Sequence, residues 1–202
     1  MTLFIIVITG VVSVYAFQRP EIMHRYNFSP YQIVQRKQYY RIFTHALLHV
    51  DWVHLIINML VLYSFGNVLV FFFNHYFTFI PAALLLIIFY VLAVVASSLV
   101  SLFKQKDNYS YSAVGASGAV SAVVFACIFF APLEKVLFFG VIPIPGIIFG
   151  LAYLVYSWYM GKKNVDNIGH DAHFWGAVFG FLFPLILEPR LINVFLHQLL
   201  NW

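Results

Sequence analysis

Long apolar runs alternate with short polar segments along the whole chain. Six runs cover about residues 3–17, 42–73, 78–103, 112–131, 136–160 and 171–187. A helix that crosses a bilayer needs about 17–25 mainly apolar residues, and in lipid its backbone groups must be satisfied within the helix. The pattern predicts an all-α membrane protein, a six-transmembrane-helix bundle over residues 1–187 followed by a short C-terminal interfacial tail over residues 188–202.

Three segments refine this picture. The second run is long and carries polar residues only in its first half, which predicts a helix that begins at the interface and then crosses. The longest connection, Gln18 to Tyr40, mixes basic and aromatic residues, so we expect it to lie at the membrane surface. The tail places Leu191, Phe195 and Leu199 on one helical face and ends in Trp202, which is typical of an interfacial helix.

The composition excludes a soluble domain and several kinds of site. Hydrophobic residues make up 63% of the chain and charged residues only 9%, whereas about a quarter of an average soluble domain is charged. The single cysteine, Cys127, allows neither a disulfide framework nor a thiolate zinc cluster. The net charge of +4 is spread over loops without forming one block, which indicates contacts with lipid headgroups and no nucleic-acid partner.

Polar side chains within the apolar runs are costly in lipid and therefore indicate function. They gather at the beginnings of the second, fourth and sixth runs. These residues are His45, His49, His54 and Asn58, then Gly115-Ala116-Ser117-Gly118, and finally His173. The three even-numbered helices would run in the same direction, so we expect their polar groups to share one pocket at one face of the membrane.

The pocket contains the groups that acyl transfer requires. A serine is a weak nucleophile unless a base accepts its proton. Small residues, including Gly115 and Gly118, surround Ser117 and leave its hydroxyl accessible. His173 is followed by Gly176 and Gly180, a spacing that permits close helix contact in a bilayer. We therefore expect His173 to reach Ser117 as its general base.

Donors for a developing negative charge are also present. Asn58 follows His54 by four positions, so both project from one helix face and could donate to the same oxygen. Each signal has an ordinary explanation, since a serine among glycines is usually a packing residue and a histidine near a helix end usually lies at the interface. Their coincidence favours a serine–histidine enzyme.

Three motifs in this order resemble the rhomboid family of intramembrane serine proteases. His49, His54 and Asn58 follow the pattern His-x4-His-x3-Asn, and residues 115–118 are similar to the family's Gly-x-Ser-Gly. The stretch from Ala172 through Gly180 is similar to Ala-His-x-x-Gly-x-x-x-Gly. The resemblance covers about residues 40–187 and implies a six-transmembrane-helix rhomboid-like bundle.

The resemblance also implies roles for particular residues. Ser117 would attack the scissile carbonyl, and His173 would take and later return the proton through an acyl-enzyme. The supporting groups would be the Ser117 N–H, Asn58 and His54 as oxyanion donors, His49 as a supporting polar residue, and Arg41 as an anchor of the first loop. No cofactor or metal is expected, and the substrates would be single-span membrane proteins cut near small residues.

The chain departs from the family pattern at three positions. Tyr40 stands where tryptophan is frequent, and it preserves an aromatic anchor beside Arg41. Ser121 stands where a tyrosine often stacks on the histidine, which leaves a different orientation of the base open. Val70 replaces a glutamate, so the anchoring of the first loop is open as well. We expect Asp171 to be a helix-start residue and not a third catalytic member.

Charge and family give opposite orientations. Most basic residues lie in or next to the odd-numbered loops: Arg19, Arg25, Arg36, Lys37, Arg41, Lys104, Lys106, Lys162 and Lys163. The positive-inside rule would place these loops in the cytoplasm, whereas the family places the site on the other side. We follow the family and expect a multi-pass protein of a bacterial inner membrane, with the site toward the non-cytoplasmic face.

Two other functions are compatible with the polar residues of the apolar runs. A histidine-based metal-binding protein or transporter could use the i, i+4 pair His45 and His49 together with His170, Asp171 and His173. That pattern lacks the glutamate of His-Glu-x-x-His and leaves the serine without a role. A non-catalytic rhomboid-like client-binding protein is the other rival, although such relatives typically lose the serine or the histidine.

Overall fold

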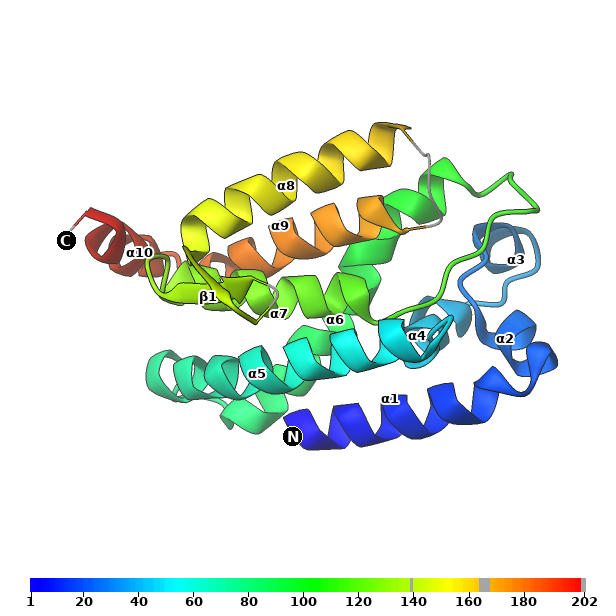
Figure 1. Ribbon diagram of the computed structural model, residues 1–202, viewed down its shortest axis with the longest axis horizontal. Helices are drawn as coiled ribbons and strands as arrows, with labels where there is room; N and C mark the ends of the chain where they lie inside the picture. The colour runs from blue at the N-terminus through cyan, green and yellow to red at the C-terminus, as the bar shows by residue number, and fades with distance from the viewer. Residues whose placement is uncertain (139, 164–167, 201–202) are drawn as a thin grey trace.

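The computed structural model describes residues 1–138, 140–163 and 168–200, and these residues are mainly helical (Figure 1). The six long helices are α1 (Thr2–Phe17), α5 (Trp52–Tyr76), α6 (Ala82–Lys104), α7 (Ser117–Phe130), α8 (Gly146–Lys163) and α9 (His170–Leu187). The shorter elements are α2 (Pro20–Tyr26), α3 (Pro30–Gln35), α4 (Arg41–Thr44), the 3-10 helix η1 (His45–Leu47), α10 (Leu191–Leu200), and the strands β1 (Lys135–Phe138) and β2 (Ile142–Pro145).

The central helix is α7, which is apolar on all sides and buried from Gly118 to Phe130. A helix without a polar face must be enclosed by other elements, and α5, α6, α8 and α9 pack against it. In Figure 1, α5, α7 and α9 all run from right to left. Their first turns, which carry the predicted polar residues, therefore lie toward the same end of the molecule.

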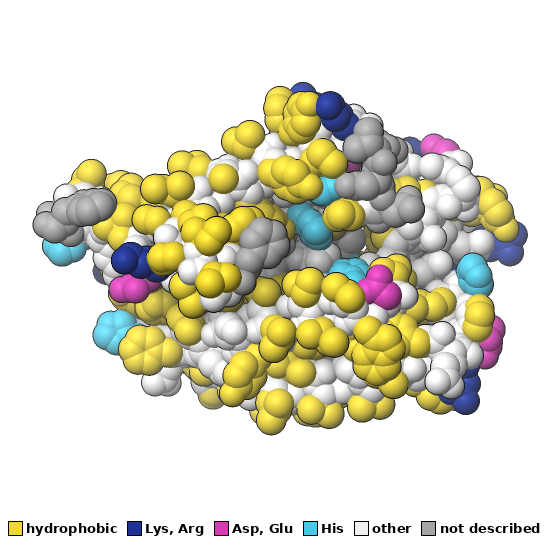
Figure 2. Space-filling view, viewed as in Figure 1, with side chains coloured by type: hydrophobic (Ala, Val, Ile, Leu, Met, Phe, Trp, Pro, Cys, Tyr) yellow, Lys and Arg dark blue, Asp and Glu magenta, His cyan; other side chains and the backbone are white. Residues whose placement is uncertain are grey.

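The outer surface is suited to lipid. Hydrophobic side chains cover much of the face seen in Figure 2, and few lysine and arginine side chains are visible on it. The buried residues of α1 are small, namely Thr2, Thr9, Ser13 and Ala16, while large ones such as Leu3 and Phe4 face outward. Small residues at helix contacts and large apolar ones outside are typical of membrane bundles.

Three of the described helices, α5, α6 and α9, are long and apolar enough to cross a membrane. Two other runs form apolar helices that are shorter, with 16 residues in α1 and 14 in α7. The structure thus gives an all-helical bundle with three candidate spans, and the predicted count of six spans is not confirmed by helix length and composition.

The second run is not one helix from residue 42, and that prediction is wrong. The chain forms α4 and η1, turns extended at Leu48, and begins α5 only at Trp52. Asp51 causes the new start, because its side chain accepts a hydrogen bond of 2.7 Å from the backbone N–H of His54. As a result, His45 and His49 do not share a helix with His54.

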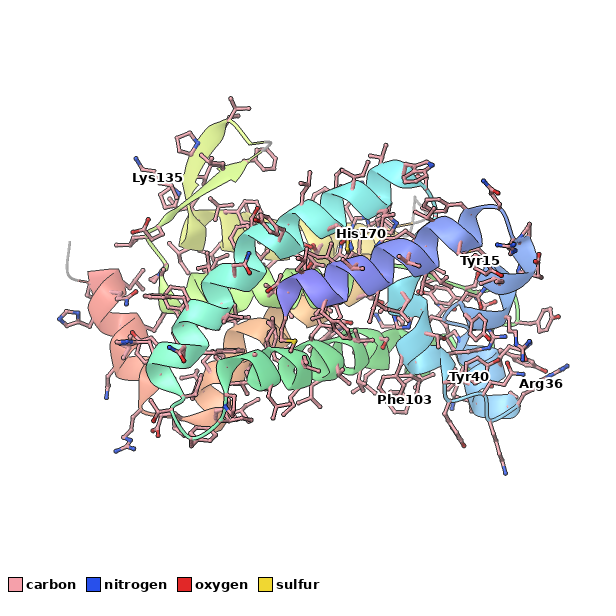
Figure 3. The ribbon with its side chains drawn as sticks, turned by 90° about the horizontal axis from the view of Figure 1, so that it is seen from below. Tyr15, Arg36, Tyr40, Phe103, Lys135 and His170 are labelled. Atoms are coloured by element: carbon pink, nitrogen blue, oxygen red, sulfur yellow. The ribbon has the colours of Figure 1, made fainter. Side chains whose placement is uncertain are left out.

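The fourth and fifth runs also begin later than predicted. The fourth helix starts at Ser117 and not near residue 112. In the fifth run, β1 and β2 form an antiparallel hairpin in which Lys135 pairs with Pro145 and Phe138 with Ile142. Prolines 143 and 145 cannot donate a helical hydrogen bond, so α8 begins only at Gly146. Figure 3 shows Lys135 in this hairpin at the end opposite Tyr40.

The tail forms α10, and its apolar face is in contact with the bundle. Leu191 and Phe195 are buried, and the Phe195 ring stacks on Phe129 with centroids 5.5 Å apart. Leu199 is partly buried against the same core. Trp202 lies outside the described residues, and the location of the tail in the membrane interface stays a prediction.

Candidate active site

Ser117 and His173 are in direct contact. Ser117 is the first residue of α7, and His173 lies in the first turn of α9. The Nε2 atom of His173 is 2.8 Å from the Ser117 Oγ atom, a hydrogen-bond distance across 56 residues of sequence. In this arrangement the imidazole can accept the hydroxyl proton, which is the role of a general base toward a serine nucleophile.

The close approach of α7 and α9 depends on glycines. A Cβ atom placed on Gly176 would overlap the backbone carbonyl of Gly118, and one placed on Gly180 would overlap that of Ala122. The two helices are therefore in backbone contact. Gly118 also faces α6, where a Cβ atom would come within 2.6 Å of the Ser97 side chain. These contacts fix the separation between the serine and the histidine.

The segment before α7 brings a second group of residues to the serine. Gly115 has a φ of +130°, a conformation that side chains disfavour. A Cβ atom there would lie 2.8 Å from Cε1 of His54 and 3.7 Å from Oγ of Ser117. Its backbone N–H donates to the carbonyl of His45 at 3.0 Å. Glycine thus lets the His54 ring lie beside the serine.

His49 connects this segment to α1. Its Nδ1 atom is 2.9 Å from Oγ of Ser13, whose hydroxyl donates to the Leu47 carbonyl at 2.8 Å. The N–H of Ala116 points to Nε2 of His49 at 3.5 Å. Burial, followed by the neighbouring His54 ring, lowers the pKa of His49 to about 4. A neutral ring with its proton on Nδ1 satisfies both contacts.

Asn58 lies one turn after His54 on α5 and is buried. Its side-chain amide donates to the His54 carbonyl at 2.9 Å. That bond uses one of the two amide hydrogens, so the second hydrogen stays available for another acceptor. The structure places the two side chains predicted as oxyanion donors, His54 and Asn58, on the same helix, as their spacing suggests.

Arg41 holds the first connection together. Its guanidinium donates to Oε1 of Gln38, to the backbone carbonyl of His24, and to both the carbonyl and the side-chain oxygen of Asn27, at 2.7–3.0 Å. Four bonds to a buried arginine tie α2 to α4. Val70, in contrast, packs against the hydrophobic core, so the loop is secured without a glutamate at that position.

The comparison with known families agrees with this geometry. Residues 36–190, more than half of the chain, match the family model of the Rhomboid domain. The chain belongs to the rhomboid family. None of the curated protein sequences matches it. Members of this family are typically serine intramembrane proteases. Together, the family match and the apolar helices indicate that this rhomboid is an integral membrane protein.

Asp171 is part of an ion pair in this rhomboid. Its Oδ2 atom lies 2.9 Å from Nζ of Lys104, which connects the end of α6 to the start of α9. A carboxylate in a first helical turn also interacts favourably with the helix dipole. Both side chains are partly exposed, at 56% for Lys104 and 31% for Asp171.

The residues proposed for a metal site come from two parts of the chain: His45 and His49 precede α5, whereas His170, Asp171 and His173 lie at the start of α9. His45 and His49 lie on different segments, and Nδ1 of His45 is 3.0 Å from the Arg41 carbonyl. Figure 3 labels His170 between the helices, where its ring meets Tyr156 with centroids 5.6 Å apart. Within residues 1–138, 140–163 and 168–200, no three His, Cys, Asp or Glu side chains are grouped to hold a metal.

Sequence reasoning missed Tyr153 of α8. Its ring is stacked near His173, with centroids 6.2 Å apart and planes at 29°. Its hydroxyl is 2.6 Å from Oγ of Ser121. Nothing in the sequence distinguishes Tyr153 from its aromatic neighbours. Ser13 was also missed, although a polar residue inside the first apolar run is a recognisable signal.

Proposed function

We propose that this rhomboid is an intramembrane serine endopeptidase that cleaves single-span membrane proteins within or next to their transmembrane segment. The observation that carries the proposal is the 2.8 Å contact between Ser117 Oγ and His173 Nε2. Hydroxyl and imidazole come from two helices whose backbones touch, so the pair is preorganised before a substrate binds.

The reaction would proceed through an acyl-enzyme. Oγ of Ser117 attacks the scissile carbonyl carbon while His173 takes the hydroxyl proton. Collapse of the tetrahedral intermediate breaks the C–N bond, and the imidazolium gives its proton to the leaving amine. Water then attacks the ester with His173 again as base, which releases the acid and restores the serine.

The negative charge on the carbonyl oxygen needs hydrogen-bond donors beside Ser117. We assign this role to the Ser117 backbone N–H, the His54 ring and the amide of Asn58. The proximity of His54 to Gly115 and the position of Asn58 one turn later support the assignment. His49 would position this group through Ala116 and Ser13.

The membrane arrangement is also part of the proposal. We propose that α1, α5, α6, α7, α8 and α9 all cross the bilayer, with the shorter α7 enclosed by the others. The site would face the non-cytoplasmic side of a bacterial inner membrane, as the family orientation suggests. This arrangement lets a substrate helix reach the site from lipid while water reaches it from the aqueous face.

A non-catalytic, client-binding rhomboid is the alternative function. A protein that only binds clients has no need for a hydrogen-bonded serine and histidine. Both side chains are present and in contact here, and this favours the protease.

The test uses purified full-length protein in liposomes with a fluorescent single-span substrate and a fluorophosphonate label. We expect Ser117→Ala and His173→Ala each to lower the cleavage rate roughly 1000-fold or more, and Ser117→Ala to abolish labelling. Ser64→Ala and His75→Ala are matched controls, because both residues are exposed on α5, and they should leave both rates unchanged. Equal cleavage by Ser117→Ala and wild type would refute the proposal.

A further inference from the structure

Tyr153 contacts the catalytic pair from a helix that carries no residue of the pair. It lies in α8 and contacts both α7 and α9. Its ring stacks on His173 of α9, and its hydroxyl is 2.6 Å from Oγ of Ser121 on α7. One side chain thus joins α7, α8 and α9.

Ser121 places this contact directly beneath the nucleophile. It follows Ser117 by four positions, so both hydroxyls lie on the same face of α7. Ser121 is buried at 7% exposure, and a buried hydroxyl without a partner is costly. The bond to Tyr153 gives the Ser121 hydroxyl a partner. It also fixes the position of the tyrosine ring along α7 relative to Ser117.

Aromatic neighbours hold the ring from the other sides. Phe125 is 5.6 Å from the Tyr153 ring and Phe149 is 6.0 Å from it, measured between centroids. These two rings lie on α7 and α8, respectively. Since its hydroxyl is also fixed, Tyr153 has little freedom to turn away from His173.

The stack has a chemical consequence for the base. The imidazole must keep Nε2 directed at Ser117 both before and after it accepts the proton. A ring that lies next to its face, with the two planes at 29°, restricts rotation out of that orientation. The negative face of an aromatic ring also attracts the imidazolium that forms as the serine attacks. Stacking therefore favours the geometry and the charge of the transition state.

We infer that Tyr153 is a positioning residue for His173 and that the Ser121 hydroxyl holds it in place. This inference rests on the proposed function, because it assigns a role in that reaction. It makes α8 part of the catalytic apparatus: a displacement of α8 from α7 takes the aromatic ring away from the base. Activity and the position of α8 are then coupled through one side chain.

The experiment compares Tyr153→Phe, Tyr153→Leu and Ser121→Ala with the wild type in liposomes. We expect Tyr153→Leu to lower kcat and the rate of fluorophosphonate labelling at least about tenfold, with KM changed less than twofold. Tyr153→Phe keeps the ring and loses the hydroxyl, so its rates should fall only about twofold to fivefold. Ser121→Ala should match Tyr153→Phe, and the double variant should be no slower than either.

Tyr159→Leu is the matched control, since Tyr159 is an exposed tyrosine on the same helix, and it should label at the wild-type rate. Tyr153→Met preserves bulk without an aromatic face and replaces the leucine variant if that one does not fold. Labelling rates are normalised to folded protein from thermal unfolding. Wild-type labelling by Tyr153→Leu or Tyr153→Met would overturn the inference, as would a phenylalanine variant as slow as the leucine variant. Absence of labelling in the wild type would instead refute the proposed function.

Discussion

α8 and α9 both flank the central helix α7, but they pack against it in different ways. The α9 interface is built from backbone, because Gly176 and Gly180 lie on the carbonyls of Gly118 and Ala122. The α8 interface is built from side chains, chiefly Tyr153 with its neighbouring aromatic rings. α9 carries His173, the proposed base, and α8 carries Tyr153, whose ring lies next to it.

This difference indicates that the two interfaces differ in rigidity. Backbone contact leaves no side chain that can change rotamer, so it defines a single separation between the two helices. Aromatic side chains can turn or shift when a neighbour changes. We therefore expect the α7–α9 contact to set the serine–histidine distance and the α7–α8 contact to be the more tolerant of the two.

Among the substitutions that test this comparison of the two interfaces, the largest effect should come from Gly176→Ala. The added methyl group meets the Gly118 carbonyl, which cannot move without shifting α7. The helices must separate, and overpacking of this kind costs about 1–3 kcal/mol of stability. The contact between Ser117 and His173 lengthens as well, so we expect cleavage to fall about 100-fold or more, measured as kcat/KM in liposomes.

Gly10→Ala is the control for this prediction, because nothing lies within 4 Å of a Cβ atom at that position. It should retain wild-type cleavage and an unchanged unfolding temperature. If Gly176→Ala were equally harmless, the backbone contact would not set the catalytic distance.

A smaller effect is expected from the same substitution on the other helix, Gly150→Ala. There the added methyl group meets side chains, at 3.3 Å from Phe125 and 3.4 Å from Ile128. Such groups can shift by a few tenths of an ångström, so cleavage should fall no more than about fivefold. The measurement is kcat/KM beside Gly176→Ala, and equal losses in both variants would remove the distinction between the two interfaces.

The smallest effect should come from Asp171→Asn, which breaks the ion pair with Lys104 at the start of α9. Partly exposed ion pairs contribute about 0–1 kcal/mol, so the unfolding temperature and the cleavage rate should change little, within about threefold for the rate. The matched variant Lys104→Gln should behave alike. A loss as large as that of His173→Ala would mean that Asp171 acts in the reaction.

The contact between Ser117 and His173 could be predicted from the sequence because the signals around each residue are local. Ser117 lies within a glycine-rich stretch, and the spacing of Gly176 and Gly180 marks a helix contact. The structure brings Ser117 and His173 to hydrogen-bond distance, and the family model covers both residues.

The starts of the helices were predicted less well, because hydropathy does not report where the backbone turns. Asp51 is a capping residue inside an apolar run, and prolines 143 and 145 disfavour a helix at their positions. Both signals are visible in the sequence, but the predicted helix bounds followed the length of the apolar runs alone.

The contact of Tyr153 with Ser121, 32 positions away, could not be predicted, since it depends on how α7 and α8 rotate against each other. Position 121 drew attention as a serine where the family often has a tyrosine. In the structure an aromatic ring from α8 lies next to His173, with centroids 6.2 Å apart. Only the packed fold shows which residue supplies that ring.

The length of α7 limits how far this helix can extend through a membrane. Its 14 residues span about 21 Å at 1.5 Å per residue, less than the roughly 30 Å of a hydrocarbon core. A helix of this length, if it stands upright, cannot reach both membrane surfaces at once. The end with Ser117 is the one surrounded by histidines and an asparagine, which tolerate water. Under the proposed function, water must reach Ser117 at this end of α7.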